Sequence, residues 1–300
     1  MIEPFVPMPP SGQVAGLRVF IHSPHGGNPV PFVADAGRMD DEQMRGVAQR
    51  YGHESAFLLP ASDARADWRL RFFVPRHEME MCGHATVGAL WALRQWGIWT
   101  RPAAVVETLS GPVQVEWDEA SGRAWVSQPA PTVRHLQDHE RGWVARALGW
   151  PESRMPSLVV NSCTSRTKTL VDVGSVEELQ MLRPGGELVE AACEAIDSTG
   201  LYPYAVDDRA ADGVVFARQF PRSSGYPEDA ATGIAAAALW GFLHQSGRIA
   251  VRRADAPAAF LVRQGDAMGR PSAIEIRPRR SDDGSVVGCW LSGRVVFAAL

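Results

Sequence analysis

Two apolar stretches decide the fold: residues 82–96 read CGHATVGALWALRQW, and residues 229–245 read DAATGIAAAALWGFLHQ. Within them we expect helices from about His84 to Trp96 and from about Gly233 to Gln245. Both are apolar on nearly every face over their first three turns, and a helix of that kind is buried in a protein core. Neither approaches the roughly 20 apolar residues that a bilayer span needs. Each of the two helices is therefore expected to lie at the centre of a separate hydrophobic core.

The two stretches also repeat each other. Ala89-Leu90-Trp91 recurs as Ala238-Leu239-Trp240, 149 residues later (238 − 89), in a chain of 300 residues. The same offset maps one amphipathic helix, predicted from Asp40 or Asp41 to Tyr51, onto another, predicted from Gly186 to about Thr199. Two classes of helix that match at one offset predict a duplicated architecture.

Short runs that are rich in Val, Ile, Phe and Trp, or that alternate in polarity, fill most of the remaining chain and predict strands. We expect strands at 17–22, 55–60, 68–74, 113–117, 158–161, 167–173, 214–220, 274–277 and 294–298. The predicted fold class is α+β, with two pseudosymmetric halves, each a curled, mostly antiparallel sheet around a central apolar helix. Gln128-Pro129-Ala130-Pro131 reads as the linker. The predicted halves are residues 1–130 and 131–300, and the last strand can cross back to the first half.

Composition narrows the class of protein. The formal net charge is -4 and the pI about 6.1, which is not the basic field of a nucleic-acid binder. The cysteines show no metal-type spacing, and we expect free thiols and no metal site. The N-terminus lacks the features of a signal peptide, so a cytoplasmic location away from membranes is expected.

The starts of the two central helices are candidate anion sites. The backbone N–H groups at a helix N-terminus lack intrahelical partners and carry partial positive charge, and glycine lets an anion come close. We therefore expect the N–H groups around Gly83 and at Thr232 and Gly233 to point into one cleft and to hold the carboxylate of a substrate. The alternative is that these glycines only permit tight packing of helix on strand.

Five stretches resemble the PhzF-like family of phenazine biosynthesis, and together they cover nearly the whole chain in the family's order. They are Gly27–Val30, Glu54–Phe57, Glu78–Thr86, Phe220–Pro221 with Glu228–Gly233, and Gln264–Gly265 followed by Met268–Ser272. The resemblance implies the fold of diaminopimelate epimerase, with one active-site cleft between two pseudosymmetric halves. It also implies an enzyme without a cofactor that assembles as a homodimer.

The resemblance assigns roles to individual residues. Glu54 matches the family's catalytic acid/base, and His84 and Asp229 match the polar pair that binds and orients the substrate. Substrate-binding positions are also expected at Asn28, Gly83, Thr232, Gly233 and Ile234. The sequence departs from the family at Ile234, where the family usually has Ser, and this departure implies a substrate different from the phenazine precursor.

The function that follows is an isomerase moving a proton between carbons of a small carboxylate, similar to PhzF-type dihydro-hydroxyanthranilate isomerases, with Glu54 as its single acid/base. One alternative is an amino-acid-type racemase or epimerase that uses Glu54 and Cys82. The offset of 149 residues places Ala231 opposite Cys82, so we expect Cys82 to be a small buried residue without a partner base. The other alternative is a non-catalytic protein that binds small anions.

Overall fold

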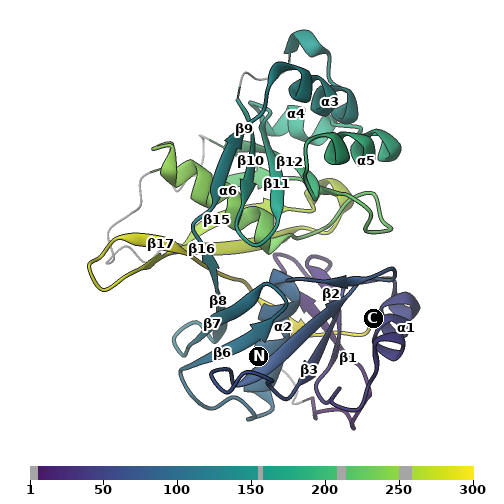
Figure 1. Ribbon diagram of the computed structural model, residues 1–300, viewed down its shortest axis with the longest axis vertical. Coiled ribbons are helices and arrows are strands. Elements are labelled where there is room, and N and C mark those ends of the chain that lie inside the picture. Colours follow the sequence, from purple (N-terminus) through teal and green to yellow (C-terminus); the bar gives the residue numbers. More distant parts are fainter. Residues whose placement is uncertain (1–5, 155–157, 208–213, 250–258) are drawn as a thin grey trace. The chain divides into compact units, whose positions relative to one another are not determined.

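The computed structural model describes residues 6–154, 158–207, 214–249 and 259–300, and the chain divides into two compact units (Figure 1). Unit 1 comprises residues 1–21, 28–127 and 292–300, and unit 2 comprises residues 22–27 and 128–291. The main division lies between residues 127 and 128. Residues 292–300 belong to unit 1 because their strand pairs with the first strand of the chain.

One short segment departs from the predicted halves. Residues 22–27 belong to unit 2 although both flanking segments belong to unit 1. Two hydrogen bonds hold the segment there: the His22 N–H donates to the Pro271 carbonyl at 3.2 Å, and the Gly27 N–H donates to Ser272 Oγ at 3.0 Å. Contacts of this kind join residues some 245 positions apart, and no local pattern in the sequence indicates them.

Unit 1 is a mixed sheet with two helices. Its helices are α1 (Asp41–Tyr51) and α2 (Gly83–Gln95). Its strands are β1 (Ala15–Val19), β2 (Asn28–Val33), β3 (Ser55–Leu59), β4 (Trp68–Phe73), β5 (Glu78–Met79), β6 (Ala103–Thr108), β7 (Gly111–Asp118), β8 (Arg123–Pro129), which ends just beyond the unit boundary, and β18 (Val295–Phe297). In the order β18-β1-β2-β3-β4-β6-β7, successive neighbours pair antiparallel, antiparallel, parallel, antiparallel, parallel and antiparallel.

Unit 2 carries its own sheet. Its helices are α3 (Asp138–Leu148), α4 (Val176–Met181), α5 (Gly186–Ala195) and α6 (Gly233–Gln245), with 3-10 turns at Glu152–Arg154 and Asp266–Met268. Its strands are β9 (Thr132–His135), β10 (Val159–Cys163), β11 (Thr167–Asp172), β12 (Gly200–Asp207), β13 (Val214–Ala217), β14 (Phe220–Pro221), β15 (Phe260–Gln264), β16 (Ser272–Arg280) and β17 (Val286–Ser292). In the order β9-β10-β11-β12-β13-β15-β16, the pairing directions are the same series as in unit 1.

The shared series of directions means that the two sheets have one topology. In each unit a helical crossover joins the parallel pair, through α1 between β2 and β3 and through α4 and α5 between β11 and β12. A second helix, α2 or α6, follows in the next crossover. The predicted mixed α+β class with mostly antiparallel pairing is confirmed.

In unit 1 the two helices cover opposite faces of the sheet because side chains alternate along a strand. Phe57 and Phe73 contact the α1 side, where Met44 and Ala48 are fully buried. Phe32 stacks on Trp96 at the end of α2, with ring centroids 6.0 Å apart. The sequence sets the bounds of α1 through an Asp40–Gln43 capping box and a left-handed Gly52.

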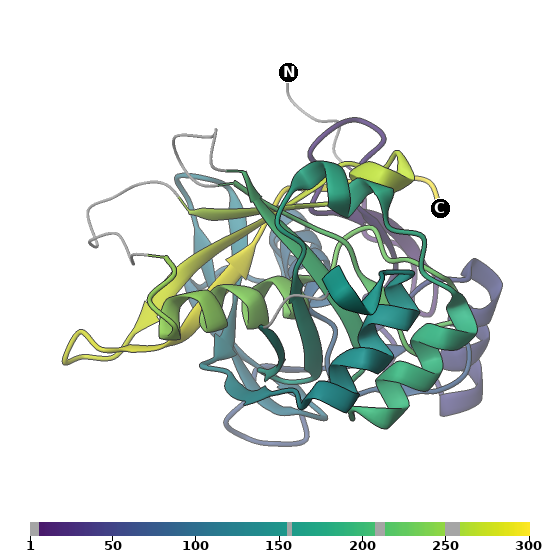
Figure 2. The same ribbon diagram turned by 90° about the horizontal axis from the view of Figure 1, so that it is seen from above.

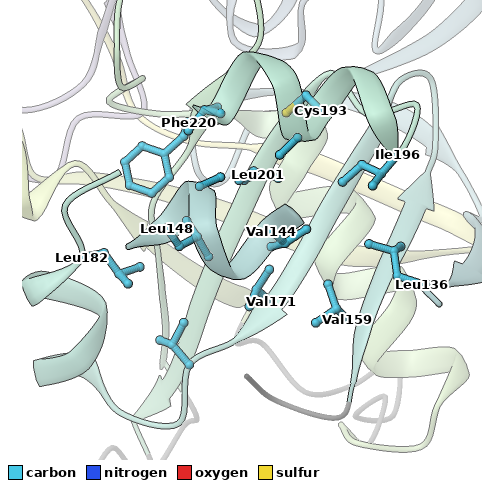
Figure 3. Close-up of a cluster of buried hydrophobic side chains, with 14 of the residues drawn as sticks. Leu136, Val144, Leu148, Val159, Val171, Leu182, Cys193, Ile196, Leu201 and Phe220 are labelled. Atoms are coloured by element: carbon cyan, nitrogen blue, oxygen red, sulfur yellow. The ribbon is translucent and has the colours of Figure 1, made fainter. Parts of the chain in front are cut away.

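Unit 2 repeats this arrangement, with more helices on one face of its sheet. Side chains from α3 and α5 pack with β10, β11 and β12 in one apolar cluster, which includes Val144, Leu148 and Val171 (Figure 3). The helix α6 contacts β10, β11 and β16 (Figure 2). The Ser162 hydroxyl on β10 donates to the Ala238 carbonyl of α6 at 3.0 Å. The helix α6 is buried along its first eleven residues, as its all-apolar pattern predicts.

Three local predictions have the wrong bounds. The predicted linker Gln128–Pro131 is reduced to Ala130 and Pro131, because β8 continues to Pro129 and β9 begins at Thr132. The strand predicted at 214–220 is interrupted at Arg218, whose side chain forms an ion pair with Glu228. The helix predicted to begin at Gly186 ends at Ala195 and does not reach Thr199.

The two longest helices have 13 residues, and none in the described part of the chain is long and apolar enough to span a membrane.

Candidate active site

Glu54 lies in a buried turn of unit 1. The left-handed Gly52 ends α1, and the chain enters β3 at Ser55, so Glu54 occupies the short connection between a helix and a buried strand. Its side chain is 11% exposed. A carboxyl group that is removed from water to this degree needs polar partners. Each partner affects the balance between the charged and the neutral form of the group.

His84 supplies one such partner. It is the second residue of α2, it is buried, and its Nε2 lies 3.6 Å from Glu54 Oε2. The other ring nitrogen, Nδ1, lies 3.4 Å from the Cys82 sulfur. The imidazole therefore stands between a thiol and a carboxylate, and each ring nitrogen can donate or accept according to the tautomer. Such a group can pass a proton to or from Glu54.

Asn28, the other polar residue predicted in unit 1, is the first residue of β2. It is buried and lies opposite Val19 of β1. Gly83 begins α2 and is buried as well, and Cys82 is the N-cap of that helix without a capping side-chain bond. The predicted residues of unit 1 are therefore all buried, as a site enclosed by protein requires.

Asp229 lies in unit 2, just before α6. Its N–H donates to the Gln219 carbonyl at 3.0 Å, in an isolated antiparallel bridge, and its side chain is buried. The Thr232 hydroxyl donates to Asp229 Oδ2 at 2.5 Å. A carboxylate that accepts such a bond is stabilised in its charged form. Gly233 and Ile234 follow as the first two residues of α6, and both are buried.

The expectation for the Thr232 backbone is wrong. Its N–H does not point to an anion, because it donates to Gln264 Oε1 at 3.1 Å. The predicted anion site at this helix can therefore use only the N–H groups that follow Thr232, beginning with Gly233. No local pattern in the sequence indicates this bond, because Gln264 lies 32 residues away, at the end of β15.

Sequence reasoning also missed an ion pair that precedes each central helix. In unit 1 the Arg71 guanidinium donates two bonds to the Glu78 carboxylate, at 2.7 and 2.5 Å. In unit 2 Arg218 donates from the same two nitrogens to Glu228, at 2.9 and 2.8 Å. Each glutamate stands five residues before the first glycine of its helix, at positions 78 and 83 and at positions 228 and 233.

The two arginines share a further contact. The Arg71 guanidinium lies over the Phe73 ring and that of Arg218 over the Phe220 ring, with 5.1 and 4.9 Å to the centroids. The repeated pattern Arg-x-Phe followed by Glu could therefore have indicated these ion pairs from the sequence. The arginines and the phenylalanines of this pattern are 147 residues apart (218 − 71 and 220 − 73), whereas the glutamates (228 − 78) and the helix starts (233 − 83) are 150 apart. At 150 the counterpart of Cys82 is Thr232, not the predicted Ala231.

The structure thus gathers the predicted residues in two groups. Glu54 and His84 lie together with Cys82 in unit 1, while Asp229 and Thr232 lie together at the start of α6 in unit 2. Convergence of the two groups on one pocket stays a prediction.

The comparisons with known proteins cover nearly the whole chain. A family model described as phenazine biosynthesis-like protein (PhzC-PhzF) matches residues 17–297. An uncharacterized isomerase of Deinococcus radiodurans is 31% identical over 294 residues, which cover 93% of this chain and 92% of that protein. A PhzF-family phenazine biosynthesis protein of Bacillus anthracis has a similar structure, with a TM-score of 0.79 at 22% identity over 95% of this chain and 96% of that one. A predicted epimerase of Pseudomonas aeruginosa gives 0.74 at 24% identity over 96% and 97% of the two chains. Likeness at these identities supports the fold.

Proposed function

The chain belongs to the PhzC/PhzF phenazine biosynthesis-like family, and on that premise we propose that it moves a proton between two carbons of a small carboxylate, with Glu54 as the acid/base. Relatives that match nearly its whole length are named isomerases, so the predicted class of enzyme is confirmed. The substrate and the mechanism are the proposal. No cofactor takes part in the mechanism proposed.

One observation carries the proposal: a buried Glu54 carboxylate with the His84 imidazole 3.6 Å away. A general base works best when its pKa lies near the operating pH, and burial moves a carboxyl group in that direction. The imidazole opposes this by favouring the carboxylate when it is protonated.

The proposed reaction has two steps. Glu54, as carboxylate, takes a proton from one carbon of the bound substrate. The electron pair of that C–H bond forms a new double bond to the neighbouring carbon, and the π electrons of the original double bond move to the far carbon. The resulting carboxylic acid then returns the proton to a second carbon, so the double bond has moved and no atom is gained or lost. His84 stabilises the charge on Glu54 before and after the transfer.

Asp229 and the start of α6 are proposed to hold the polar part of the substrate. The Gly233 N–H belongs to the first turn of a helix, whose N–H groups are suited to a substrate carboxylate. Ile234 presents an aliphatic side chain where the family usually has Ser. We therefore propose a substrate with an apolar group at that position, unlike the phenazine precursor.

The test is a screen in deuterium oxide. Cyclic and amino-acid-like carboxylates are incubated with the protein, and exchange or migration of C–H protons is followed by proton NMR. For the compound that reacts, Glu54→Gln should lower the rate by about a hundredfold or more, the usual effect of removing a general acid/base. A rate that survives this substitution would contradict the role of Glu54.

A racemase or epimerase is the second candidate, and the contact of Cys82 Sγ with His84 Nδ1 favours it. A thiol beside an imidazole can become a reactive thiolate. On this mechanism Cys82→Ala would lose as much activity as Glu54→Gln, and the product would be the mirror-image or epimeric form of the substrate. On the isomerase mechanism only Glu54→Gln is severe, so one pair of variants separates the two.

A further inference from the structure

A glutamine that no predicted role includes lies at the centre of the Asp229 group. Gln264, the last residue of β15, is fully buried, and its side-chain amide takes part in four hydrogen bonds. Its Oε1 accepts from the Tyr202 hydroxyl at 3.0 Å and from the Thr232 N–H at 3.1 Å. Its Nε2 donates to the Asp229 carbonyl at 2.8 Å and to Thr232 Oγ1 at 3.1 Å. Every position on the amide is used.

The orientation of this amide follows from which neighbouring groups can donate a hydrogen bond and which can accept one. A backbone N–H can only donate and a backbone carbonyl can only accept. The Thr232 N–H must therefore face Oε1, and the Asp229 carbonyl must face Nε2. The opposite orientation would set two donors against each other and two acceptors against each other, and all of these groups would be buried and unsatisfied.

The fixed amide in turn orients the Thr232 hydroxyl. Because Nε2 donates to Oγ1, the hydroxyl accepts on that side and has one proton left to give. That proton goes to Asp229 Oδ2, only 2.5 Å from Oγ1. Since Oδ2 accepts this bond, a proton on the Asp229 carboxyl group can only be on Oδ1.

We infer that Gln264 is a positioning residue, which acts through Thr232 to hold Oδ2 of Asp229 as an acceptor and to confine proton exchange at this carboxylate to Oδ1. The role given to Asp229 rests on the function proposed above, whereas the hydrogen-bond network does not depend on it. Asp229 then meets its substrate as a carboxylate with one oxygen already oriented.

The ionisable groups around Asp229 in unit 2 agree with this assignment. Burial raises the pKa of the Tyr202 phenol well above its usual value, and the charge of Asp229 acts in the same direction. The phenol therefore keeps its proton and remains a donor to Oε1. The adjacent Glu228 is occupied by its bidentate ion pair with Arg218.

Close packing also fixes where Gln264 stands. The next residue, Gly265, has a φ of +81°, and a Cβ placed on it would come within 2.7 Å of the Ala230 carbonyl and 2.3 Å of the Arg270 carbonyl. The end of β15 can approach the turn after Asp229 this closely only because residue 265 is glycine. The amide of Gln264 is thereby held at the Asp229–Thr232 turn.

The inference is tested by measuring the pKa of Asp229 directly, with no substrate required. The protein is labelled with carbon-13 at the aspartate carboxyl groups and titrated by NMR, and the resonance missing from Asp229→Asn identifies the residue. Thr232→Val removes the donor to Oδ2, and a hydrogen bond to a charged group contributes about 1.5–3 kcal/mol. The pKa of Asp229 should therefore rise by about one to two units, at about 1.4 kcal/mol per unit.

Two further variants test the part played by Gln264. Gln264→Met, similar in size but without the amide, should also raise the pKa of Asp229, because the Thr232 hydroxyl is then no longer oriented. Gln264→Glu, which cannot donate from its carboxylate, should act in the same direction and serves if the Met variant does not fold. Thr232→Ser keeps the hydroxyl and should leave the pKa within about 0.3 unit of the original value.

An unchanged pKa of Asp229 in folded Gln264→Met or Gln264→Glu would overturn the inference, as would a rise in Thr232→Ser equal to that in Thr232→Val. Failure of the proposed function has a different signature. It would show as undiminished turnover in Glu54→Gln, while the titration of Asp229 still responded to Gln264 and Thr232.

Discussion

Replacing Glu228 by Gln should destabilise the protein more than any comparable change at the matching glutamate of unit 1. The side chains of Arg218 and Glu228 are only 7% and 13% exposed. Arg218 also donates to the carbonyls of Leu179 and Leu182, at 3.1 and 2.9 Å, so its guanidinium cannot turn to solvent. Breaking a buried pair leaves a buried charge uncompensated, and the expected loss is about 3–5 kcal/mol.

Glu78→Gln is the matched control, because it removes the same kind of partner from Arg71. The side chains of that pair are 14% and 20% exposed, and Arg71 keeps a second carboxylate, Asp41, at 2.8 Å. Its neighbours raise the pKa of the Arg71 guanidinium above its usual value, with Glu78 the largest cause. An arginine side chain keeps its charge in a protein even without such a partner, so Arg71 stays charged in Glu78→Gln. The expected loss is the smaller value of about 1.5–3 kcal/mol for a bond to a charged group.

Urea unfolding, followed by circular dichroism and tryptophan fluorescence, measures both losses. A loss in Glu228→Gln no larger than that in Glu78→Gln would refute the reasoning.

Three more predictions follow from single positions. Gly265→Ala should lower the free energy of unfolding by more than Gly12→Ala, since both have positive φ but only Gly265 has atoms within 4 Å of the added Cβ; equal losses in thermal melts would contradict the packing argument. Cys82→Ala should keep turnover within about tenfold, and a loss matching that of Glu54→Gln would favour the racemase. Burial raises the pKa of Cys193 and of Cys289 to about 12, from an ordinary value of 9.0. The folded state then holds protons that the unfolded state releases, so stability is full below pH 9 and falls toward pH 12, by about 1.4 kcal/mol per pH unit for each thiol. Urea unfolding at pH 8 and pH 10 checks this, and Cys289→Ala should reduce the decline; an equal decline in that variant would contradict it.

Much of the fold was predictable because its strongest signals are local. The all-apolar runs in 82–96 and 229–245 became α2 and α6 with nearly the expected bounds, and the Asp40 cap and Gly52 stop did the same for α1. The segment Gln128–Pro131 misled because proline and glutamine suggest a loop. The Gln128 side chain is in fact buried, and β8 extends through Gln128 and Pro129.

The candidate site was predictable only in part, and the reason is the range of its contacts. The motifs that resemble the family indicated Glu54, His84 and Asp229. Glu54 and His84 proved to be neighbours. The bond from Thr232 to Gln264 joins residues that are far apart in the sequence, and so do the bonds that hold segment 22–27. The sheet brings these residues together, so no local sequence pattern indicates the contacts. The Arg-x-Phe and Glu repeat was visible in the sequence, but its meaning needed the two bidentate ion pairs.

The most direct test of the central claim is the stereochemistry of the proton transfer by Glu54. The position that matches Cys82 in unit 2 is Thr232, which is not a second base. One base reaches only one face of a planar intermediate, so the proton should leave and return on the same face at two different carbons. With the reactive compound from the screen, turnover in deuterium oxide should place label only on the face from which hydrogen was lost. Label entering the opposite face would show a second base and contradict the account.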